Sequence, residues 1–254
     1  MTAPAIIEVT GLTKNFGGVL ALDDFSLDVR AGEVVGIVGP NGAGKTAFIN
    51  VVTGFYRATR GSIRFEGREI SHLSRHQISR LGIARTFQNI RLFRRMTVLE
   101  NVLVAQRRHA AAPFASVFGL RSRRHDVDEA MATLNLMGLV DQADRAAGAL
   151  AYGDARRLEI ARALAGQPKL LFLDEPAAGM NEAETAELIE DVRRSRRFVA
   201  AIVLVEHDMA LIRELSDRLV AMDFGRKMVE GTPDQVFVDP VFVKAYLGLE
   251  GGNA

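Results

Sequence analysis

The amino-acid sequence predicts an α/β protein: a P-loop nucleotide-binding core with a mixed or parallel sheet, an antiparallel β subdomain and an inserted α-helical subdomain. Three observations predict this class. A Gly-rich turn at 39–46 lies between a continuous apolar run and a stretch with helical spacing. Two more apolar runs, 169–176 and 199–208, are separated by a helical stretch, the order expected of buried parallel strands. The segment before them, 88–166, has a helical pattern and is rich in Arg and Ala.

The chain is expected to form one domain over residues 1–254. Short segments that mix apolar alternation with turn residues, at 5–9, 19–29 and 61–67, predict the antiparallel sheet. Phe224-Gly225 marks a small hairpin. The expected parts are a core with β subdomain at 1–87 and 167–232, a helical subdomain at 88–166 and a helical C-terminal tail at 233–254.

Composition bounds the class of protein. The 254 residues are 48% hydrophobic, which suits a compact protein with a real core. With 32 Lys+Arg against 31 Asp+Glu the net charge is +1, so nothing global indicates a nucleic-acid partner. The basic clusters 91–95 and 193–197 are interpreted as solvated helix faces, since no aromatic residues alternate with their basic residues as in a nucleic-acid surface. No cysteine is present, which excludes disulfides, thiolate metal sites and cysteine nucleophiles.

The N-terminal segment lacks a basic stretch followed by a long apolar one, so it does not resemble a secretory signal. The longest apolar runs, such as 199–205, are too short to cross a bilayer. We therefore expect the chain to be made and kept inside the cell.

The stretch "GPNGAGKT" fits the pattern G-x-x-x-x-G-K-[ST] in the required strand–loop–helix context. Backbone N–H groups of such a loop surround phosphate oxygens, Lys45 supplies charge to the β and γ phosphates, and the Thr46 hydroxyl is a ligand for Mg²⁺. A chance Gly-rich turn is the alternative. The expected nucleotide-binding positions are Gly39, Pro40, Asn41, Gly42, Ala43, Gly44, Lys45, Thr46 and Ala47.

The stretch "LLFLDEP" places two acids, Asp174 and Glu175, at the end of an apolar strand, where open α/β sheets carry their ligand-facing residues. Asp174 is expected to hold Mg²⁺ through water. Glu175 points to the other face and is the candidate general base that polarises the attacking water. A helix-capping acidic pair is the alternative.

Further motifs follow in a fixed order: "TFQNIRLF" with Gln88, "LAYGD" at 150–154, "AAGMN" ending at Asn181 and "LVEHD" with His207. Together with the phosphate loop and the acid pair, they resemble the ATP-binding subunits of ABC transporters over nearly the whole chain. Longer matches, such as "ARTFQNIRLFRRMTVLENVLVA" and "LAYGDARRLEIARALA", resemble the subunits of branched-chain amino-acid importers.

This resemblance implies a site shared between two chains, which clamp two ATP molecules head to tail. The helix start at Gly153 and Asp154 would face the γ-phosphate of ATP held by the second chain, where helix N–H groups and the helix dipole favour an anion. His207 would contact the same phosphate and the attacking water. Gln88 would touch Mg²⁺ and transmit the state of the site to the membrane partners. Asn181 belongs to the loop after the acid pair and is counted among the nucleotide contacts.

The resemblance also implies that Phe16 stacks on adenine. Taken alone, Phe16 is more simply a core aromatic and His207 an ordinary histidine. For the helix start at 150–154, the alternative is that Asp154 caps its own helix.

The implied cofactors are ATP and Mg²⁺. The implied partners are two transmembrane permease subunits, a second ATP-binding subunit in a homo- or heterodimer and, indirectly, an extracytoplasmic binding protein, but no nucleic acid. The chain would then lie peripherally on the cytoplasmic face of the membrane. A soluble ABC ATPase acting on ribosomes or DNA is the alternative, although such proteins typically fuse two cassettes or carry coiled-coil insertions, and this chain has a single cassette without a heptad run. A non-enzymatic regulator would require the loss of Glu175 or His207.

Two motifs depart from the family pattern. The common signature Leu-Ser-Gly-Gly-Gln is here Leu150 to Asp154, and Ala151 lacks the hydroxyl that serine offers phosphate. A carboxylate at Asp154, about 5 Å from phosphate at an effective dielectric near 20, would cost on the order of 3 kcal/mol before screening. Alternatively Asp154 interacts favourably with the helix dipole and accepts a hydrogen bond from a ribose hydroxyl, the milder interpretation that we prefer.

Ala47 stands after Thr46, where the family usually has a second hydroxyl that reaches the α-phosphate. Its absence would weaken nucleotide binding by one hydrogen bond to a charged group, roughly 1.5–3 kcal/mol. The sequence therefore predicts an active ATPase with a weakened site.

Overall fold

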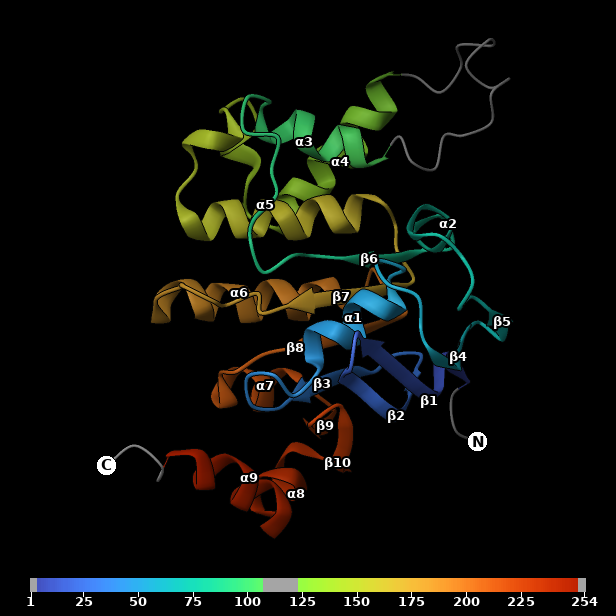
Figure 1. Cartoon of the computed structure of the whole chain (residues 1–254). Coiled ribbons are helices and arrows are strands. Elements are labelled where there is room, and N and C mark those ends of the chain that lie inside the picture. The colour runs from blue at the N-terminus through green and yellow to red at the C-terminus, as the bar shows by residue number, and fades with distance from the viewer. Residues whose placement is uncertain (1–3, 107–122, 251–254) are drawn as a thin grey trace.

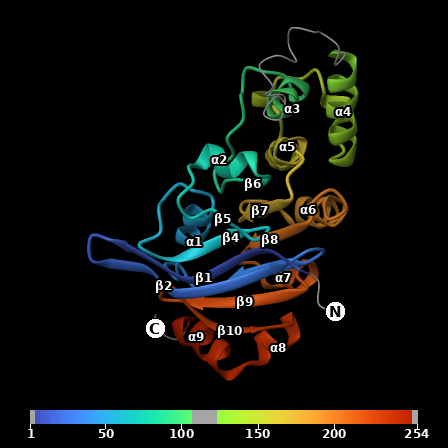
Figure 2. The same ribbon diagram turned by 90° about the vertical axis from the view of Figure 1, so that its right-hand side faces the viewer.

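The computed structural model describes residues 4–106 and 123–250. Residues 107–122 of the expected helical subdomain and 251–254 of the expected tail lie outside the described residues, as do 1–3. Two sheets form the centre of the molecule, with helices α3 to α5 at one end and α8 and α9 at the opposite end (Figures 1 and 2).

The smaller sheet is antiparallel and the larger one is mixed. The smaller sheet has the order β2-β1-β4-β5, with β1 at Ala5–Phe16, β2 at Val19–Arg30, β4 at Arg60–Phe65 and β5 at Arg68–Glu69. The larger sheet has the order β10-β9-β3-β8-β7-β6, with β3 at Val34–Val38, β6 at Ile83–Arg85, β7 at Leu170–Asp174, β8 at Ala201–Val205, β9 at Arg218–Asp223 and β10 at Arg226–Gly231. Its neighbours pair in parallel except for β9 and β10. The predicted fold class is confirmed.

Helices lie on both faces of the larger sheet, with α1 on one face and α5, α6 and α7 on the other. The helices are α1 at Lys45–Val52, α2 at Arg75–Arg80, α3 at Val98–Gln106, α4 at Arg123–Leu136, α5 at Tyr152–Ala165, α6 at Glu182–Ser195, α7 at Met209–Leu215, α8 at Pro233–Val238 and α9 at Pro240–Glu250. Two 3-10 turns, Val140–Gln142 and Ala147–Ala149, lie between α4 and α5. Within the described residues, no helix combines the length and the apolar character that crossing a membrane requires.

The strands of the larger sheet are continuous apolar runs because both of their faces are buried. In β8, Val203 and Val205 face the cluster that α1 shares with the antiparallel sheet, whereas Ile202 and Leu204 face the cluster of α5, α6 and α7. Helix α1 contributes Phe48, whose ring lies 4.9 Å from that of Phe25 in β2. The antiparallel sheet and α1 therefore share one core, which fixes the phosphate loop at the start of α1.

The parallel strands bring the predicted motifs to one edge. Since β3, β6, β7 and β8 run in the same direction, their carboxyl ends meet there. The phosphate loop follows β3, the Gln88 loop follows β6, the acid pair ends β7 and His207 follows β8.

Some elements differ from the sequence prediction. Strand β6 and helix α2 were not predicted, because three and six residues are too few to show a period. The tail contains two helices rather than one: Thr232 caps α8 in a capping box, and Pro240 starts a new helix two residues after Val238. The predicted hairpin is confirmed as β9 and β10, with Phe224 in the left-handed region at φ 44°.

Candidate nucleotide-binding and hydrolysis site

The phosphate loop depends on a glycine at its end. Gly44 is the N-cap of α1 with φ 104°, and a Cβ there would lie 2.5 Å from the carbonyl oxygen of Ala21. Only glycine fits this conformation and this approach. Helix α1 has no acidic residue in its first turn, so its positive end is open to an anion.

Lys45 lies inside this loop. Its Nζ donates to the carbonyl oxygens of Gly39, at 2.5 Å, and Pro40, at 3.0 Å. The residue is only 5% exposed, and burial lowers its pKa while Glu175 and Asp174 act in the opposite direction. The ammonium is therefore already positioned in the loop, where phosphate oxygens can replace the carbonyl contacts.

Asp174 is paired with a cation that the sequence did not reveal. Its Oδ2 lies 3.0 Å from a guanidinium nitrogen of Arg85, and both side chains are nearly buried. Burial raises the pKa of Asp174, with Arg85 opposing the shift. Arg85 also donates to Oδ1 of Asn50 at 2.7 Å, which links β6 to α1. Arg85 directly precedes the "TFQ" motif, but nothing in the local pattern identifies its partner.

Three predicted catalytic residues meet at Glu175. Gln88 Nε2 donates to Oε2 of Glu175 at 2.6 Å, and His207 Nε2 lies 2.9 Å from Oε1. These residues are 87 and 32 positions from Glu175 in the chain. Glu175 has φ 47°, a left-handed conformation that is costly for a non-glycine residue and is typical of functional sites.

The residues at this edge fit ATP with Mg²⁺. The Thr46 side chain is exposed at the start of α1, which follows β3, and the Asp174 carboxylate lies at the end of β7 on the same edge of the sheet. Hydroxyl and carboxylate oxygens are the ligands that Mg²⁺ prefers. In this structure the amide of Gln88 contacts Glu175, so its metal contact stays a prediction.

We define residues 151–154 as the mouth of α5. The N-cap of α5 is Ala151 and Asp154 lies within the first turn, so Asp154 is not the N-cap residue of its own helix. Asp154 Oδ2 instead accepts from Gln142 Nε2 at 2.8 Å, and Oδ1 lies 3.8 Å from Arg157. The carboxylate is therefore partly neutralised within its own chain.

Gly153 is buried against α6. A Cβ at this position would lie 2.9 Å from Oε1 of Glu184, so the end of that flexible side chain would have to shift. This close approach favours a glycine even without a nucleotide. The predicted contact with a phosphate of the second chain stays a prediction.

A buried arginine ties the mouth of α5 to the Gln88 loop. The Arg156 side chain is fully buried and donates to the carbonyl oxygens of Phe87 at 2.6 Å and Gln88 at 2.7 Å. It also pairs with Glu159 at 2.9 Å, whose Oε1 accepts from the N–H of Phe87. This pair could not be predicted from the sequence, since arginines and glutamates in an amphipathic helix ordinarily face solvent.

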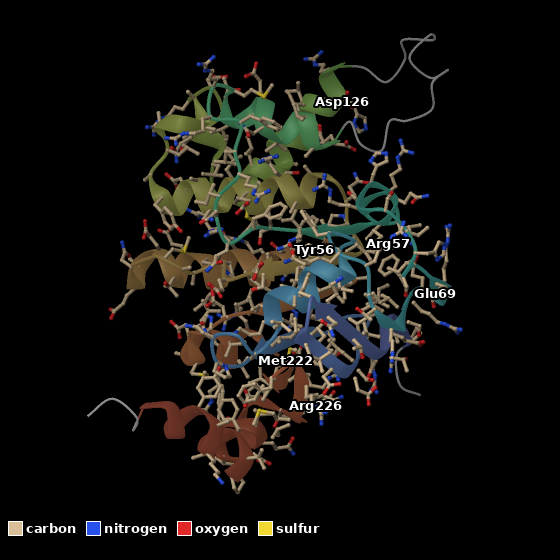
Figure 3. All side chains as sticks on the ribbon, in the orientation of Figure 1. Tyr56, Arg57, Glu69, Asp126, Met222 and Arg226 are labelled. Carbon is tan, nitrogen blue, oxygen red and sulfur yellow. The ribbon has the colours of Figure 1, made fainter. Side chains whose placement is uncertain are left out.

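Phe16 and Asn181, two other predicted nucleotide contacts, each have defined neighbours in the structure. Phe16 is 39% exposed and packs edge-on against Tyr56, which is labelled in Figure 3, with the ring centroids 5.0 Å apart. The alternative that Phe16 is a core aromatic is therefore wrong. Asn181 is the N-cap of α6: its side chain accepts from the N–H of Glu184, and the Glu184 side chain accepts from the N–H of Asn181. Their nucleotide contacts stay predictions.

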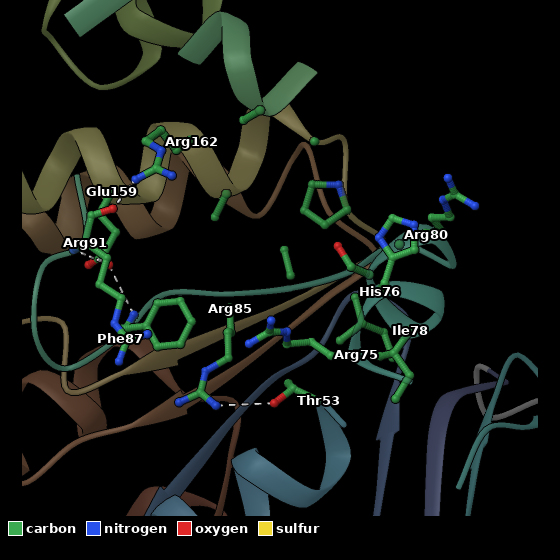
Figure 4. Close-up of a pocket in the computed structure, with 18 of the residues that line it drawn as sticks. Thr53, Arg75, His76, Ile78, Arg80, Arg85, Phe87, Arg91, Glu159 and Arg162 are labelled. Atoms are coloured by element: carbon green, nitrogen blue, oxygen red, sulfur yellow. Dashed lines mark hydrogen bonds between the residues drawn. The ribbon is translucent and has the colours of Figure 1, made fainter. Parts of the chain in front are cut away.

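A cavity of about 540 Å³ lies beside the Gln88 loop, between α2 and α5 (Figure 4). Its lining combines aromatic rings with guanidinium groups. Arg75 lies over the ring of Phe55 at 4.7 Å, and Arg91 over that of Phe87 at 4.4 Å. The cavity therefore adjoins the residue that precedes Gln88.

A phosphate loop, an acid pair and a histidine at one edge of a parallel sheet define a P-loop nucleotide-binding ATPase. The model of one protein family, the ABC transporters, matches residues 22–178. The chain belongs to the ATP-binding proteins of this family.

Relatives extend the similarity to nearly the whole chain. The chain is 47% identical over 249 residues to the high-affinity branched-chain amino acid transport ATP-binding protein BraF of Pseudomonas aeruginosa, covering 96% of this chain and 98% of that protein. It is 44% identical over 251 residues to the protein LivG of Escherichia coli, which has the same description, with the same two coverages. The predicted resemblance is confirmed.

A solved structure supports the fold independently. The ADP conformation of MJ1267, an ATP-binding cassette of an ABC transporter, is 32% identical and superposes with a TM-score of 0.86. It covers 97% of this chain, and this chain covers all of it.

Proposed function

We propose that this chain hydrolyses ATP to drive the import of branched-chain or related amino acids, as one of two ATP-binding subunits on two membrane permease subunits at the cytoplasmic face. The observation that carries the ATPase proposal is the convergence of Gln88 and His207 on the carboxylate of Glu175. The descriptions of BraF and LivG support the class of substrate.

The chemistry follows from the side chains at the sheet edge. Lys45 holds the β and γ phosphates and offsets the charge that develops on the γ-phosphoryl group. Glu175 accepts a proton from the attacking water, and His207, at 2.9 Å from Glu175, orients the same water and the γ-phosphate. Gln88 restrains the second oxygen of Glu175. Mg²⁺, when held by Thr46 and Asp174, would supply charge neutralisation of the phosphates.

The site is completed by a second chain. The mouth of α5 has no side-chain cap, so its first N–H groups can bind a phosphate of ATP held by the partner's phosphate loop. This arrangement supports a head-to-tail dimer, in which each chain supplies both halves of two shared sites.

The cavity between α2 and α5 supports the membrane contact, since a segment bound there would touch Phe87, next to Gln88. The absence of cysteine makes this testable with single cysteines. His76→Cys, an exposed position on the cavity wall, should crosslink to a membrane subunit in native membranes. Val238→Cys, 75% exposed on α8, is the matched control and should not crosslink.

Reconstitution tests the proposed function directly. The chain is purified with its membrane and ATP-binding partners, placed in proteoliposomes with the binding protein, and assayed for ATP hydrolysis and uptake of labelled leucine. We expect both activities in the wild type and neither with Glu175→Gln. No ATP hydrolysis by the wild-type assembly would contradict the proposal. Recovery of the chain with ribosomes or DNA, and without polytopic proteins, would favour the soluble alternative.

A further inference from the structure

Glu206 is a buried acid with no role so far. It lies between the end of β8 and His207 and is 4% exposed. Among residues 4–106 and 123–250, its hydrogen-bond partners are backbone N–H groups, and no Lys or Arg pairs with it. Burial raises its pKa, while backbone hydrogen bonds from Ala177, His207 and Asp208 oppose the shift. Burying a carboxylate without a cation costs free energy, so the hydrogen bonds that Glu206 accepts must offset this cost and fix its position.

The two oxygens of Glu206 bind two different loops. Oε1 accepts from the backbone N–H of Ala177 at 2.8 Å, in the loop that follows Glu175. Oε2 accepts from the backbone N–H of His207 at 2.9 Å. One further backbone bond, from the N–H of Glu175 to the carbonyl of Val205 at 2.9 Å, joins the same two loops. Glu206 is thus the side chain that holds the loop of Glu175 against the loop of His207.

The Ala177 segment is also held from the other side. The hydroxyl of Tyr152, in the mouth of α5, donates to the carbonyl oxygen of Ala178 at 2.6 Å. The segment 177–178 therefore connects the mouth of α5 to Glu206, and through Glu206 to His207. In the proposed dimer this mouth contacts the ATP of the second chain.

We propose that Glu206 is a positioning residue for ATP hydrolysis: its carboxylate sets the placement of His207 relative to Glu175 and links that placement to the mouth of α5. The inference rests on the proposed function. Glu206 does not touch the nucleotide, since its oxygens are committed to backbone N–H groups. Loss of this carboxylate should impair the chemical step and spare ATP binding, which depends on the phosphate loop.

Glu206→Gln is the primary test because it preserves size and leaves only one acceptor oxygen for two N–H groups. In the reconstituted assembly we expect kcat to fall by about tenfold, the equivalent of one charged hydrogen bond, and KM for ATP to change by less than about twofold. Hydrogen–deuterium exchange of the full chain should rise at 176–181 and 207–208 and stay unchanged in the strands of the larger sheet.

Glu33→Gln is the matched control. Glu33 is also a largely buried acid, but its hydrogen bonds connect it to Arg218, at the opposite ends of the strands. This variant should keep the wild-type kcat and KM. Should Glu206→Gln fail to fold, Glu206→Asp keeps the charge and withdraws it by one carbon, so the same split between kcat and KM is expected.

The possible outcomes separate the two proposals. A folded Glu206→Gln protein with wild-type kcat would overturn the positioning role, as would a loss of kcat accompanied by exchange that rises across the whole sheet. If the wild-type assembly shows no hydrolysis, the proposed function fails, and the exchange experiment still decides whether the carboxylate holds the two loops.

Discussion

The molecule carries two helix starts that are proposed to bind phosphate, and they are held in different ways. The start of α1 is shaped by backbone: Gly44 in a left-handed conformation, and Lys45 bonded to two carbonyl oxygens of its own loop. The mouth of α5 is shaped by side chains: Tyr152 binds Ala178, Asp154 binds Gln142, and Arg156 binds the Gln88 loop.

The two halves of the site are therefore built from different parts of the chain. The α1 half is complete within a contiguous motif, because a glycine-rich turn needs only its own N–H groups to surround phosphate. The α5 half depends on residues far away in the chain, so its position is coupled to the Gln88 loop and to the loop after Glu175. Substitutions at the two helix starts should therefore have different signatures.

Arg156→Met should have the largest effect. It removes the bonds to the carbonyl oxygens of Phe87 and Gln88 and leaves Glu159 buried without its cation, a loss of about 3–5 kcal/mol in the free energy of unfolding. Denaturant unfolding of the full chain measures this value. The double variant Arg156→Met/Glu159→Gln should recover part of the loss, since no charge stays buried. A single variant as stable as the wild type would show that the pair does not hold the loop.

Lys45→Ala should come next and should affect function rather than folding. The Lys45 side chain bonds only carbonyl oxygens of its own loop, so unfolding should change little. Removing a preorganised charge from the phosphoryl group should reduce kcat by about 100-fold or more. ATP hydrolysis is the measurement, and Lys169→Ala, an exposed lysine paired with Glu66, is the control. Equal losses in the two variants would argue against a role for this loop.

Ala47→Ser should strengthen the α1 half. A hydroxyl in the first turn of α1 can donate to the α-phosphate, and a hydrogen bond to a charged group at the lower end of its range corresponds to about tenfold tighter ATP binding. Calorimetric titration of the full chain with a non-hydrolysable ATP analogue gives the affinity. Unchanged affinity would mean that the nucleotide lies out of reach of this position.

Asp154→Gln should have the smallest effect. Because Gln142 and Arg157 already hold the carboxylate, replacing it should change kcat by less than about threefold. The rate of ATP hydrolysis by the reconstituted assembly decides the matter. A rise of about tenfold or more, equivalent to at least about 1.4 kcal/mol, would instead support repulsion between the carboxylate and phosphate, whose unscreened Coulomb energy is about 3 kcal/mol.

Much of the site could be predicted from the sequence because its motifs are local. The spacing of Gly39, Lys45 and Thr46 defines a phosphate loop in one segment, and an acid pair after an apolar strand needs no other context. The contacts of Arg85, Arg156 and Glu206 could not be predicted. Each joins positions that are distant in the chain, and each side chain is of a type that is ordinarily exposed.

The fold class and the family follow from the amino-acid sequence, since continuous apolar runs and motif order are properties of the chain. Which groups meet depends on how the elements pack. Packing pairs Asp174 with Arg85, turns Asp154 toward Gln142 and places Glu206 between two loops. A buried charge must find hydrogen-bond partners wherever the packed strands and helices provide them, and parallel strand ends gather those partners from distant segments.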